Sequence, residues 1–268
     1  MAVVGIPILI FSKYLLFAIA LSILALFAVY EMFRVMGIEK QLVICAPAYI
    51  LALAYPTAAY YLSAPYILEF ILGGAAALFA YLIYLFFVAV FKKGSLKFAE
   101  VSEAFAAAFY IIFSFGSISI MRYMKPSVGL LYIVLMLLCA WGSDMFAYFT
   151  GRFFGKHKLI PEVSPKKTVE GAIGGIIAAG ALSMLFGFIV SRFSDLTPNY
   201  LVLAICGIIL AAVSQVGDLI ASLIKREHGV KDYGNIFPGH GGVMDRFDSI
   251  LSIATVLMAI CILFPPFV

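Results

Sequence analysis

Leu196–Gly217 reads LTPNYLVLAICGIILAAVSQVG, 22 residues without a charged side chain. A helix that crosses the hydrocarbon core of a bilayer needs about 20 mostly apolar residues. The run is long enough for that, so it predicts a transmembrane helix. Asp218 follows it immediately, which places a carboxylate at the predicted edge of the membrane.

Comparable apolar runs recur along the chain. They are Tyr14–Tyr30, Ile71–Phe91, Ala104–Met121, Pro126–Ser143, Gly171–Val190 and Ser249–Val268. The longer uncharged run Gln41–Leu68 should hold one more span in its first half, because Pro56 and Pro65 turn the chain after it. Eight full spans result, and the apolar but half-length Met1–Phe11 adds a short or re-entrant ninth.

The composition agrees with a membrane protein. Of the 268 residues, 65% are hydrophobic and 12% are charged, and the mean hydropathy is +1.11, whereas globular domains are typically about 45–50% apolar. No polar segment is long enough to build a soluble domain. We therefore predict an all-α, polytopic helical bundle that forms one integral membrane domain over residues 1–268, with scaffold helices in 1–125 and the catalytic portion in 126–268.

Basic residues concentrate on alternate loops. The loops Glu31–Lys40, Lys92–Glu103, Asp144–Glu170 and Asp218–Asp248 hold 14 of the 18 lysines and arginines. Because cytoplasmic loops carry the excess of Lys and Arg, these loops are predicted to face the cytoplasm. The net charge of +4 comes from loops, so it indicates topology and anionic lipid headgroups, and we expect no nucleic-acid partner.

The densest charge lies in Ser222–Asp248, which reads SLIKREHGVKDYGNIFPGHGGVMDRFD. Charged side chains beside a membrane core are costly and are usually functional. On a helix that continues from the preceding run, Asp218 and Ser222 share one face with the pair Lys225–Arg226. A carboxylate and two cations on one face suit a metal–phosphate site. Cations that merely reach toward headgroups would leave Asp218 unexplained.

The second half of this stretch contains the glycine-rich segment Gly234–Gly242, which can present backbone N–H groups to phosphate oxygens ahead of a helix N-terminus. Asp245 and Asp248 follow at a spacing that faces one way on that helix. They fit a divalent cation with oxygen ligands, for which Mg²⁺ is typical at phosphate sites. Acids in the first turn can also serve only to balance the helix dipole. His240 fits either a hydrogen bond to phosphate or a brace for the loop.

A third group of polar residues lies upstream, in the segment SPKKTVEG that starts at Ser164. Lys166 and Lys167 precede a threonine that suits the N-cap of the next helix, and so they form an anion-binding corner. Asp144, at the end of an earlier span, is either a third metal ligand or a structural partner of Arg152.

Acids for a cation, several basic residues and a phosphate-binding loop, without a candidate covalent nucleophile, indicate metal-assisted phosphoryl or nucleotidyl transfer. The same residues resemble the signature of the phosphatidate cytidylyltransferases, also called CDP-diacylglycerol synthases. The resemblance rests on Ser222-x-Ile224-Lys225-Arg226, Lys231-Asp232-x-Gly234, Phe237-Pro238-x-His240-Gly241-Gly242-Val243 and Asp245-Arg246-Phe247-Asp248, with Trp141-x-Ser143-Asp144, Gly151-Arg152, Ser164-Pro165-Lys166-Lys167-Thr168 and Gln215-x-Gly217-Asp218 upstream. It covers roughly residues 140–248.

The resemblance implies that CTP and phosphatidate react to give CDP-diacylglycerol and pyrophosphate in phospholipid biosynthesis, with Mg²⁺ and room for a second cation. The lipid phosphate would attack the α-phosphorus of CTP in line. The residues implied as catalytic are Asp218, Lys225, Arg226, Lys231, Asp232, His240, Asp245 and Arg246. Those implied as phosphate-binding are Lys166, Lys167, Ser222, Lys225, Arg226, Gly241 and Gly242, and those implied as metal ligands are Asp218, Asp245, Asp248 and Asp144.

The family also implies a bacterial-type inner membrane, an active site on its cytoplasmic face, contacts with membrane lipids and a homodimer. The glycine-rich run Gly171–Gly180 allows close helix packing, either within the chain or between two chains. Two other functions are alternatives. A CTP-dependent lipid or polyprenol kinase would use a similar pocket and release CDP. An ion or phosphate transporter would explain acids in membrane segments, but it predicts dispersed charges and inverted repeats, which the sequence lacks.

Overall fold

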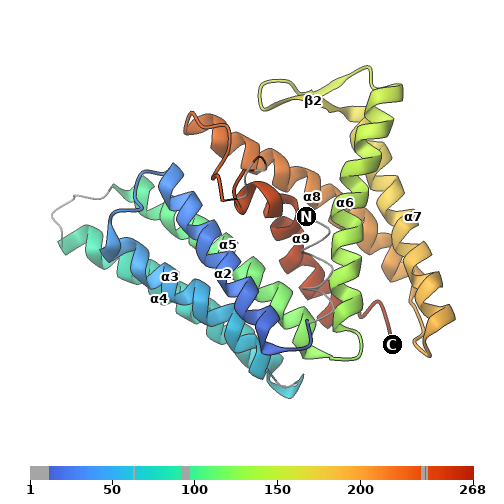
Figure 1. Cartoon of the computed structure of the whole chain (residues 1–268), viewed down its shortest axis with the longest axis horizontal. Helices are drawn as coiled ribbons and strands as arrows, with labels where there is room; N and C mark the ends of the chain where they lie inside the picture. Colours follow the sequence, from blue (N-terminus) through green and yellow to red (C-terminus); the bar gives the residue numbers. More distant parts are fainter. Residues whose placement is uncertain (1–11, 63, 92–96, 237–238, 240) are drawn as a thin grey trace. The chain divides into compact units, whose positions relative to one another are not determined.

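The computed structural model describes residues 12–62, 64–91, 97–236, 239 and 241–268. Within these residues lie eight helices that are long and apolar enough to cross a membrane (Figure 1). They are α2 (Leu15–Val35), α3 (Leu42–Ala58) together with the 3₁₀ turn that extends it to Tyr61, α4 (Ile67–Phe91), α5 (Phe98–Met124), α6 (Gly129–Phe154), α7 (Val169–Phe193), α8 (Tyr200–Glu227) and α9 (Met244–Leu263). The remaining elements are the 3₁₀ turns η1 (Ala59–Tyr61) and η2 (Ala64–Tyr66), and a hairpin of β1 (Lys158–Ile160) and β2 (Ser164–Thr168).

Each of the eight predicted spans overlaps one of these helices, so the predicted polytopic helical bundle is confirmed. Pro56 lies in the last turn of α3, and the two 3₁₀ turns follow it. The chain therefore turns where the prolines predicted, because proline cannot donate the backbone hydrogen bond that continues a helix. The predicted ninth segment, Met1–Phe11, lies outside the described residues.

Several helices run further than their apolar sequences do, and two of them carry predicted site residues. α6 continues to Phe154 and α8 continues to Glu227. Helical hydrogen bonds satisfy the backbone in lipid and in water alike, so a helix need not end where its apolar run ends. Asp144, expected at the end of a span, therefore lies inside a helix. Asp218 and Lys225 share one continuous helix, as predicted.

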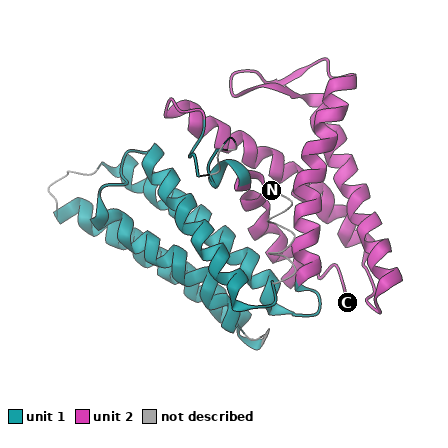
Figure 2. Ribbon diagram, in the orientation of Figure 1, with its two compact units in different colours: residues 1–129, 232–246 teal, residues 130–231, 247–268 magenta. Residues whose placement is uncertain are grey.

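The chain forms two compact units (Figure 2). Unit 1 comprises the described parts of Met1–Gly129 and Asp232–Arg246, and unit 2 comprises Leu130–Lys231 and Phe247–Val268. Asp232–Arg246 thus groups with the N-terminal unit, where side chains of α2 bind it. The division into scaffold helices over 1–125 and a catalytic portion over 126–268 stays a prediction.

In unit 1, Tyr55 of α3 fills the space between α4 and α5. A Cβ on Gly74 of α4 or on Gly116 of α5 would overlap the Tyr55 ring. The ring also stacks on Phe70 and Phe113, with centroid distances of 5.1 and 6.1 Å. These helices thus pack closely because glycine stands where the aromatic ring needs room.

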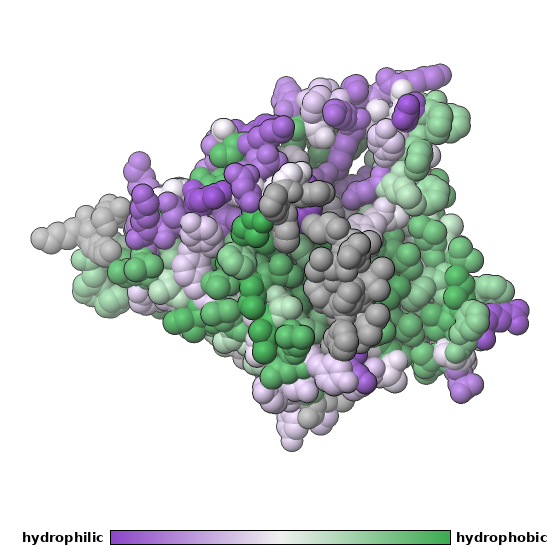
Figure 3. Space-filling view, viewed as in Figure 1, coloured by the Kyte–Doolittle hydropathy of each residue, from purple (hydrophilic) through white to green (hydrophobic). Residues whose placement is uncertain are grey.

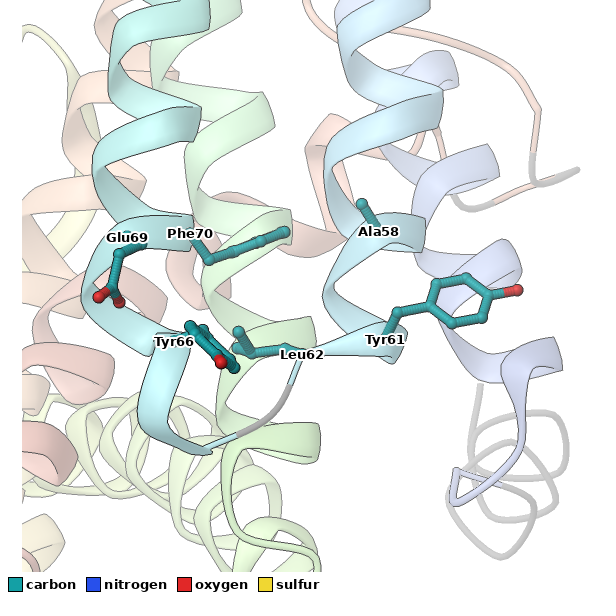
Figure 4. Close-up of a pocket in the computed structure, with 6 residues that line it drawn as sticks. All are labelled: Ala58, Tyr61, Leu62, Tyr66, Glu69 and Phe70. Atoms are coloured by element: carbon teal, nitrogen blue, oxygen red, sulfur yellow. The ribbon is translucent and has the colours of Figure 1, made fainter.

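A cavity of about 400 Å³ lies beside the two 3₁₀ turns of unit 1 (Figure 4). Its lining is mostly apolar or aromatic and consists of Ala58, Tyr61, Leu62, Tyr66, Glu69 and Phe70. Among the described residues that line it, Glu69 alone is charged, and its charge is negative. The cavity is therefore unsuited to a phosphate.

In unit 2, glycines let α7 pack closely on α6 and α8. A Cβ on Gly171 would lie 2.6 Å from the carbonyl oxygen of Ala147 in α6, and one on Gly180 would lie 3.1 Å from Ile208 in α8. Close packing within the chain, one of the two predicted uses of this run, is confirmed. α7 also exposes apolar side chains such as Ile177. Its flank is hydrophobic in Figure 3, whereas the hairpin end of the unit is hydrophilic.

Candidate active site

Four charged side chains from four elements of unit 2 come together. Asp144 lies on α6, Lys167 on β2, Asp218 on α8 and Asp248 on α9. Nζ of Lys167 lies 2.5 Å from Oδ2 of Asp218. The carboxylates of Asp144, Asp218 and Asp248 lie within electrostatic range of one another. Three acids taken from separate motifs therefore gather at one place, with a lysine among them.

A close approach of α8 and α9 brings Asp218 and Asp248 together. A Cβ on Gly217 would overlap Ser252 of α9 and would lie 3.4 Å from the carbonyl oxygen of Asp248. Asp248 is only 9% exposed, and Lys225 lies within its electrostatic range. A buried carboxylate is costly unless donors or opposite charges offset it. Glycine at position 217 is thus what allows these two acids to be neighbours.

Gln215 fixes α8 against α6 and α7. Its buried Nε2 donates to Oγ of Ser143 at 3.0 Å and to the carbonyl oxygen of Ala172 at 3.1 Å. Nζ of Lys167 lies 3.5 Å from the carbonyl oxygen of Gln215. Gln215 therefore sets the position of α8 along its neighbours, and with it the position of Asp218. The sequence placed it in a motif but gave it no role.

Asp144, Lys167, Gln215 and Asp218 border a cavity of about 450 Å³ in unit 2, within the range of about 300–1,000 Å³ that is usual for small-molecule sites. Asp144 and Asp218 are its acidic lining residues. Its basic lining residues are Arg152, Lys156, Lys158, Lys166 and Lys167. The positive excess suits a polyphosphate, and the two acids beside it suit a cation.

The hairpin carries most of these lysines. β1 and β2 pair antiparallel, with Lys158 opposite Thr168. Thr168 caps α7 as predicted, because its Oγ1 accepts the N–H of Gly171 at 3.2 Å. Nδ1 of His157 lies 2.7 Å from Oε1 of Glu170. The hairpin is thus anchored to the first turn of α7, where the two predicted lysines precede the helix.

The acids of the cavity suit a divalent cation whose coordination is completed by oxygens of the substrate. Asp144 was predicted as either a metal ligand or a partner of Arg152. Nη1 of Arg152 donates to the hydroxyl of Tyr148 at 3.2 Å, whereas Asp144 lies within electrostatic range of Asp218 and Lys167. No three His, Cys, Asp or Glu side chains in the described part of the chain form a ready metal site. Mg²⁺ at phosphate sites commonly takes one or two carboxylates, plus waters and phosphate oxygens. The pair Asp144 and Asp218 fits that pattern.

The glycine-rich loop belongs to unit 1 and uses an N–H group differently from the prediction. The N–H of Gly242 donates to Oδ2 of Asp245 at 3.0 Å, and the N–H of Tyr233 donates to the same oxygen at 2.8 Å. The Gly242 donor is therefore taken by a carboxylate instead of being offered to a phosphate. Gly239 and Gly241 have φ of 73° and 83°, a conformation that favours glycine.

The other predicted residues divide between the units. Ser222, Lys225, Arg226 and Lys231 lie in unit 2, Asp232, Gly241 and Arg246 lie in unit 1, and His240 lies outside the described residues. Arg226, Lys231, Asp232 and Arg246 are exposed. The roles of these residues stay predictions.

The sequence reasoning missed Glu31 of α2. Glu31 is 1% exposed, and its carboxylate accepts the N–H groups of Val243 and Met244 at 3.0 and 2.9 Å. In the sequence it counted only as the first residue of a basic loop. An acid that directly follows an apolar run was the available signal, because a buried carboxylate requires partners.

Known proteins are similar to this chain in sequence. The chain matches the model of the cytidylyltransferase family over residues 1–264. It is 41% identical over 188 residues to a phosphatidate cytidylyltransferase of Bacillus subtilis, which covers 70% of this chain and 68% of that protein. It is 45% identical over 135 residues to one of Staphylococcus epidermidis, half of each chain. It is 38% identical over 168 residues to one of Staphylococcus aureus, 63% of this chain and 62% of that protein. The family match extends over nearly the whole chain, and this protein therefore belongs to the cytidylyltransferase family.

Proposed function

We propose that this protein transfers the cytidylyl group of CTP to phosphatidate and forms CDP-diacylglycerol and pyrophosphate. One observation carries the proposal, the gathering of Asp144, Lys167, Asp218 and Asp248 beside a cavity lined with cations. Acids that can hold a cation and bases that can hold phosphates are the groups that nucleotidyl transfer requires. The name of the relatives, phosphatidate cytidylyltransferase, supports the acceptor.

In this mechanism the basic residues hold and neutralise the phosphates. Lys158, Lys166 and Lys167 would contact the triphosphate, and Lys225 would contact the lipid phosphate. Because two anions must approach each other, this neutralisation lowers the barrier. An oxygen of the phosphatidate phosphate forms a bond to the α-phosphorus of CTP as the bond from that phosphorus to the bridging oxygen breaks. Pyrophosphate leaves, and no side chain becomes covalently modified.

Lys167 would change partner when substrate binds. Its side chain is 25% exposed and that of Asp218 is 31% exposed, so both can be reached from the cavity. A phosphate that attracts Lys167 would release Oδ2 of Asp218 for Mg²⁺. Asp218 and Asp144 would then hold the ion, with Asp248 as a further ligand. A metal-binding role of Asp245 stays a prediction from the sequence. When bound, Mg²⁺ supplies positive charge to the phosphate oxygens.

The proposed orientation puts the cavity on the cytoplasmic side of a bacterial inner membrane. It is supported by the loop charges, since the cavity's hairpin lies in a loop rich in lysine and arginine. CTP would enter from the cytoplasm, and phosphatidate would enter from the bilayer between helices. A homodimer stays a prediction from the family.

The test uses purified protein in lipid nanodiscs with Mg²⁺, phosphatidate and CTP labelled at the α-phosphate. We expect the label in CDP-diacylglycerol, with release of pyrophosphate. Asp218→Asn should lose about 100-fold or more of this activity, a typical effect of removing a charge-stabilising group. Asp195→Asn, which changes an exposed acid beyond the far end of α7, should keep it. Formation of a phosphorylated lipid and CDP, or no CDP-lipid from the wild type, would contradict the proposal.

A further inference from the structure

A buried acid of α2 holds the glycine-rich loop of unit 1. Oε1 of Glu31 accepts the N–H of Val243 at 3.0 Å, and Oε2 accepts the N–H of Met244 at 2.9 Å. Val243 and Met244 stand at the start of α9, where N–H groups have no partner within the helix. Glu31, 212 residues away from Val243, thus takes the place that an external anion would occupy at this helix terminus.

The same part of α2 binds the other end of the loop. Nη2 of Arg34 donates to the carbonyl oxygen of Tyr233 at 2.7 Å, and Tyr233 is fully buried. Asp245 accepts the N–H groups of both Tyr233 and Gly242, so it closes the loop at its base. The loop 233–242 is therefore attached to α2 at both of its ends.

Two glycines of this loop are matched to the Glu31 carboxylate. A Cβ on Gly234 or on Gly242 would overlap it. Neither glycine has a positive φ, so the backbone conformation does not require glycine at these positions. Glycine is required there because the Glu31 carboxylate lies too close for a side chain. These two glycines and Glu31 therefore fit each other tightly.

We propose that Glu31, assisted by Arg34, is a positioning residue that fixes the two described ends of this loop, Tyr233–Gly234 and Gly242–Met244, against α2 for the reaction. A buried carboxylate that loses its donors is costly, so the loop cannot leave α2 without leaving Glu31 unpaired. Backbone that is already fixed before the reaction loses little entropy when the substrates bind to the protein. The catalytic part of this inference rests on the proposed function, and the attachment itself does not.

The charges favour a positioning role over direct contact with substrate. Glu31 is negative and lies in electrostatic range of a second acid, Asp245. Two neighbouring carboxylates repel a phosphate, and both oxygens of Glu31 are already occupied by N–H donors. Arg34 offsets part of this negative charge. Glu31 therefore acts through the backbone of the loop.

Hydrogen exchange of the intact protein in nanodiscs, without substrate, measures the attachment. Peptides that cover residues 233–246 should exchange about tenfold faster in Glu31→Gln, because an amide offers one acceptor oxygen where the carboxylate offers two. Arg34→Gln should also speed their exchange. Glu69→Gln, which changes an exposed acid of the same unit, is the matched control and should exchange like the wild type. Peptides of α3 and α5 should stay protected, which separates release of the loop from unfolding.

The kinetic readout is a double-mutant cycle. Glu31→Gln should lower kcat/KM for CDP-diacylglycerol formation about tenfold, and Glu69→Gln should not. Gly234→Ala should lower kcat/KM in the wild type, because its methyl meets the fixed carboxylate. In Glu31→Ala the same methyl has room, so Gly234→Ala should cost little further.

Unchanged exchange over 233–246 in Glu31→Gln would overturn the attachment. Faster exchange with unchanged kcat/KM, or fully additive effects in the cycle, would overturn the positioning role. If the wild type makes no CDP-diacylglycerol, the proposed function fails and takes the positioning role with it. The exchange measurement still decides the attachment in that case, so the two failures are distinguishable.

Discussion

Gly217→Ala tests whether the close approach of α8 and α9 sets the acids of the cavity. The added methyl would overlap Oγ and Cβ of Ser252 and would lie 3.4 Å from the carbonyl oxygen of Asp248. Gly217 is buried and Ser252 is half-buried, so the contact has little room to yield. The overlap is relieved if α8 moves away from α9, which carries Asp218 away from Asp248.

The expected stability change is a difference of two terms. One extra methyl in a close-packed contact costs about 1–3 kcal/mol. Replacing glycine by alanine inside a helix gains about 0.5–1 kcal/mol. The net loss should be about 1 kcal/mol, which lowers Tm by about 2–4 °C in a chain of this size. Activity should suffer more, because a displacement of about 1 Å at reacting groups costs about 100-fold in rate.

The assay compares Tm and kcat/KM for CDP-diacylglycerol formation in a matched set. Gly73→Ala in α4 is the control, because nothing lies within 4 Å of its added Cβ; this variant should be fully active and at least as stable as the wild type. Adding Ser252→Gly to Gly217→Ala removes the overlapping atoms and should restore most of the Tm. The reasoning is refuted if Gly217→Ala behaves like Gly73→Ala in both measurements.

Three further outcomes are expected. Lys167→Met should lower kcat/KM about 10- to 100-fold, because a hydrogen bond to a charged group is worth about 1.5–3 kcal/mol. The control is Lys40→Met, which changes an exposed lysine. Equal kinetics in the two variants would contradict a phosphate-binding role of Lys167. Gln215→Leu breaks two hydrogen bonds between helices and should cost about 1–3 kcal/mol in unfolding measurements; a loss no greater than that of the exposed Gln41→Leu would argue against it. Chelation by EDTA should abolish activity, and added Mg²⁺ should restore it. Tm should stay nearly unchanged, because Lys167 already pairs with Asp218. Activity that survives chelation would contradict the proposed metal site.

The helices could be predicted because the hydrocarbon core of the bilayer disfavours charged side chains at every position of a span. Leu196–Gly217 has no charge over a membrane-crossing length, and it overlaps α8. The ends of the helices were harder to predict. Asp144 lies within α6 and not at its end, because hydrophobicity marks where lipid ends, whereas intrahelical hydrogen bonds decide where the helix ends.

The glycine-rich loop shows what a local pattern leaves open. Its glycines predicted N–H groups that wait for a phosphate. The N–H of Gly242 is instead taken by Asp245, and those of Val243 and Met244 are taken by Glu31. Glycine content indicates that donors can point one way, but it cannot tell which acceptor meets them. For Val243 and Met244 the acceptor, Glu31, comes from the other end of the chain.

The sequence by itself determined the membrane class, the number of spans in the described chain and the residues that carry the family signature. These follow from composition, run length and local motif, which are properties of neighbouring residues. The tertiary structure decided which of those residues lie near one another. Asp144, Lys167, Asp218 and Asp248 meet because Gly217 admits α9 and Gln215 ties α8 to α6 and α7. Such meetings depend on how closely helices approach one another, and close packing between distant segments is not written in any single stretch of sequence.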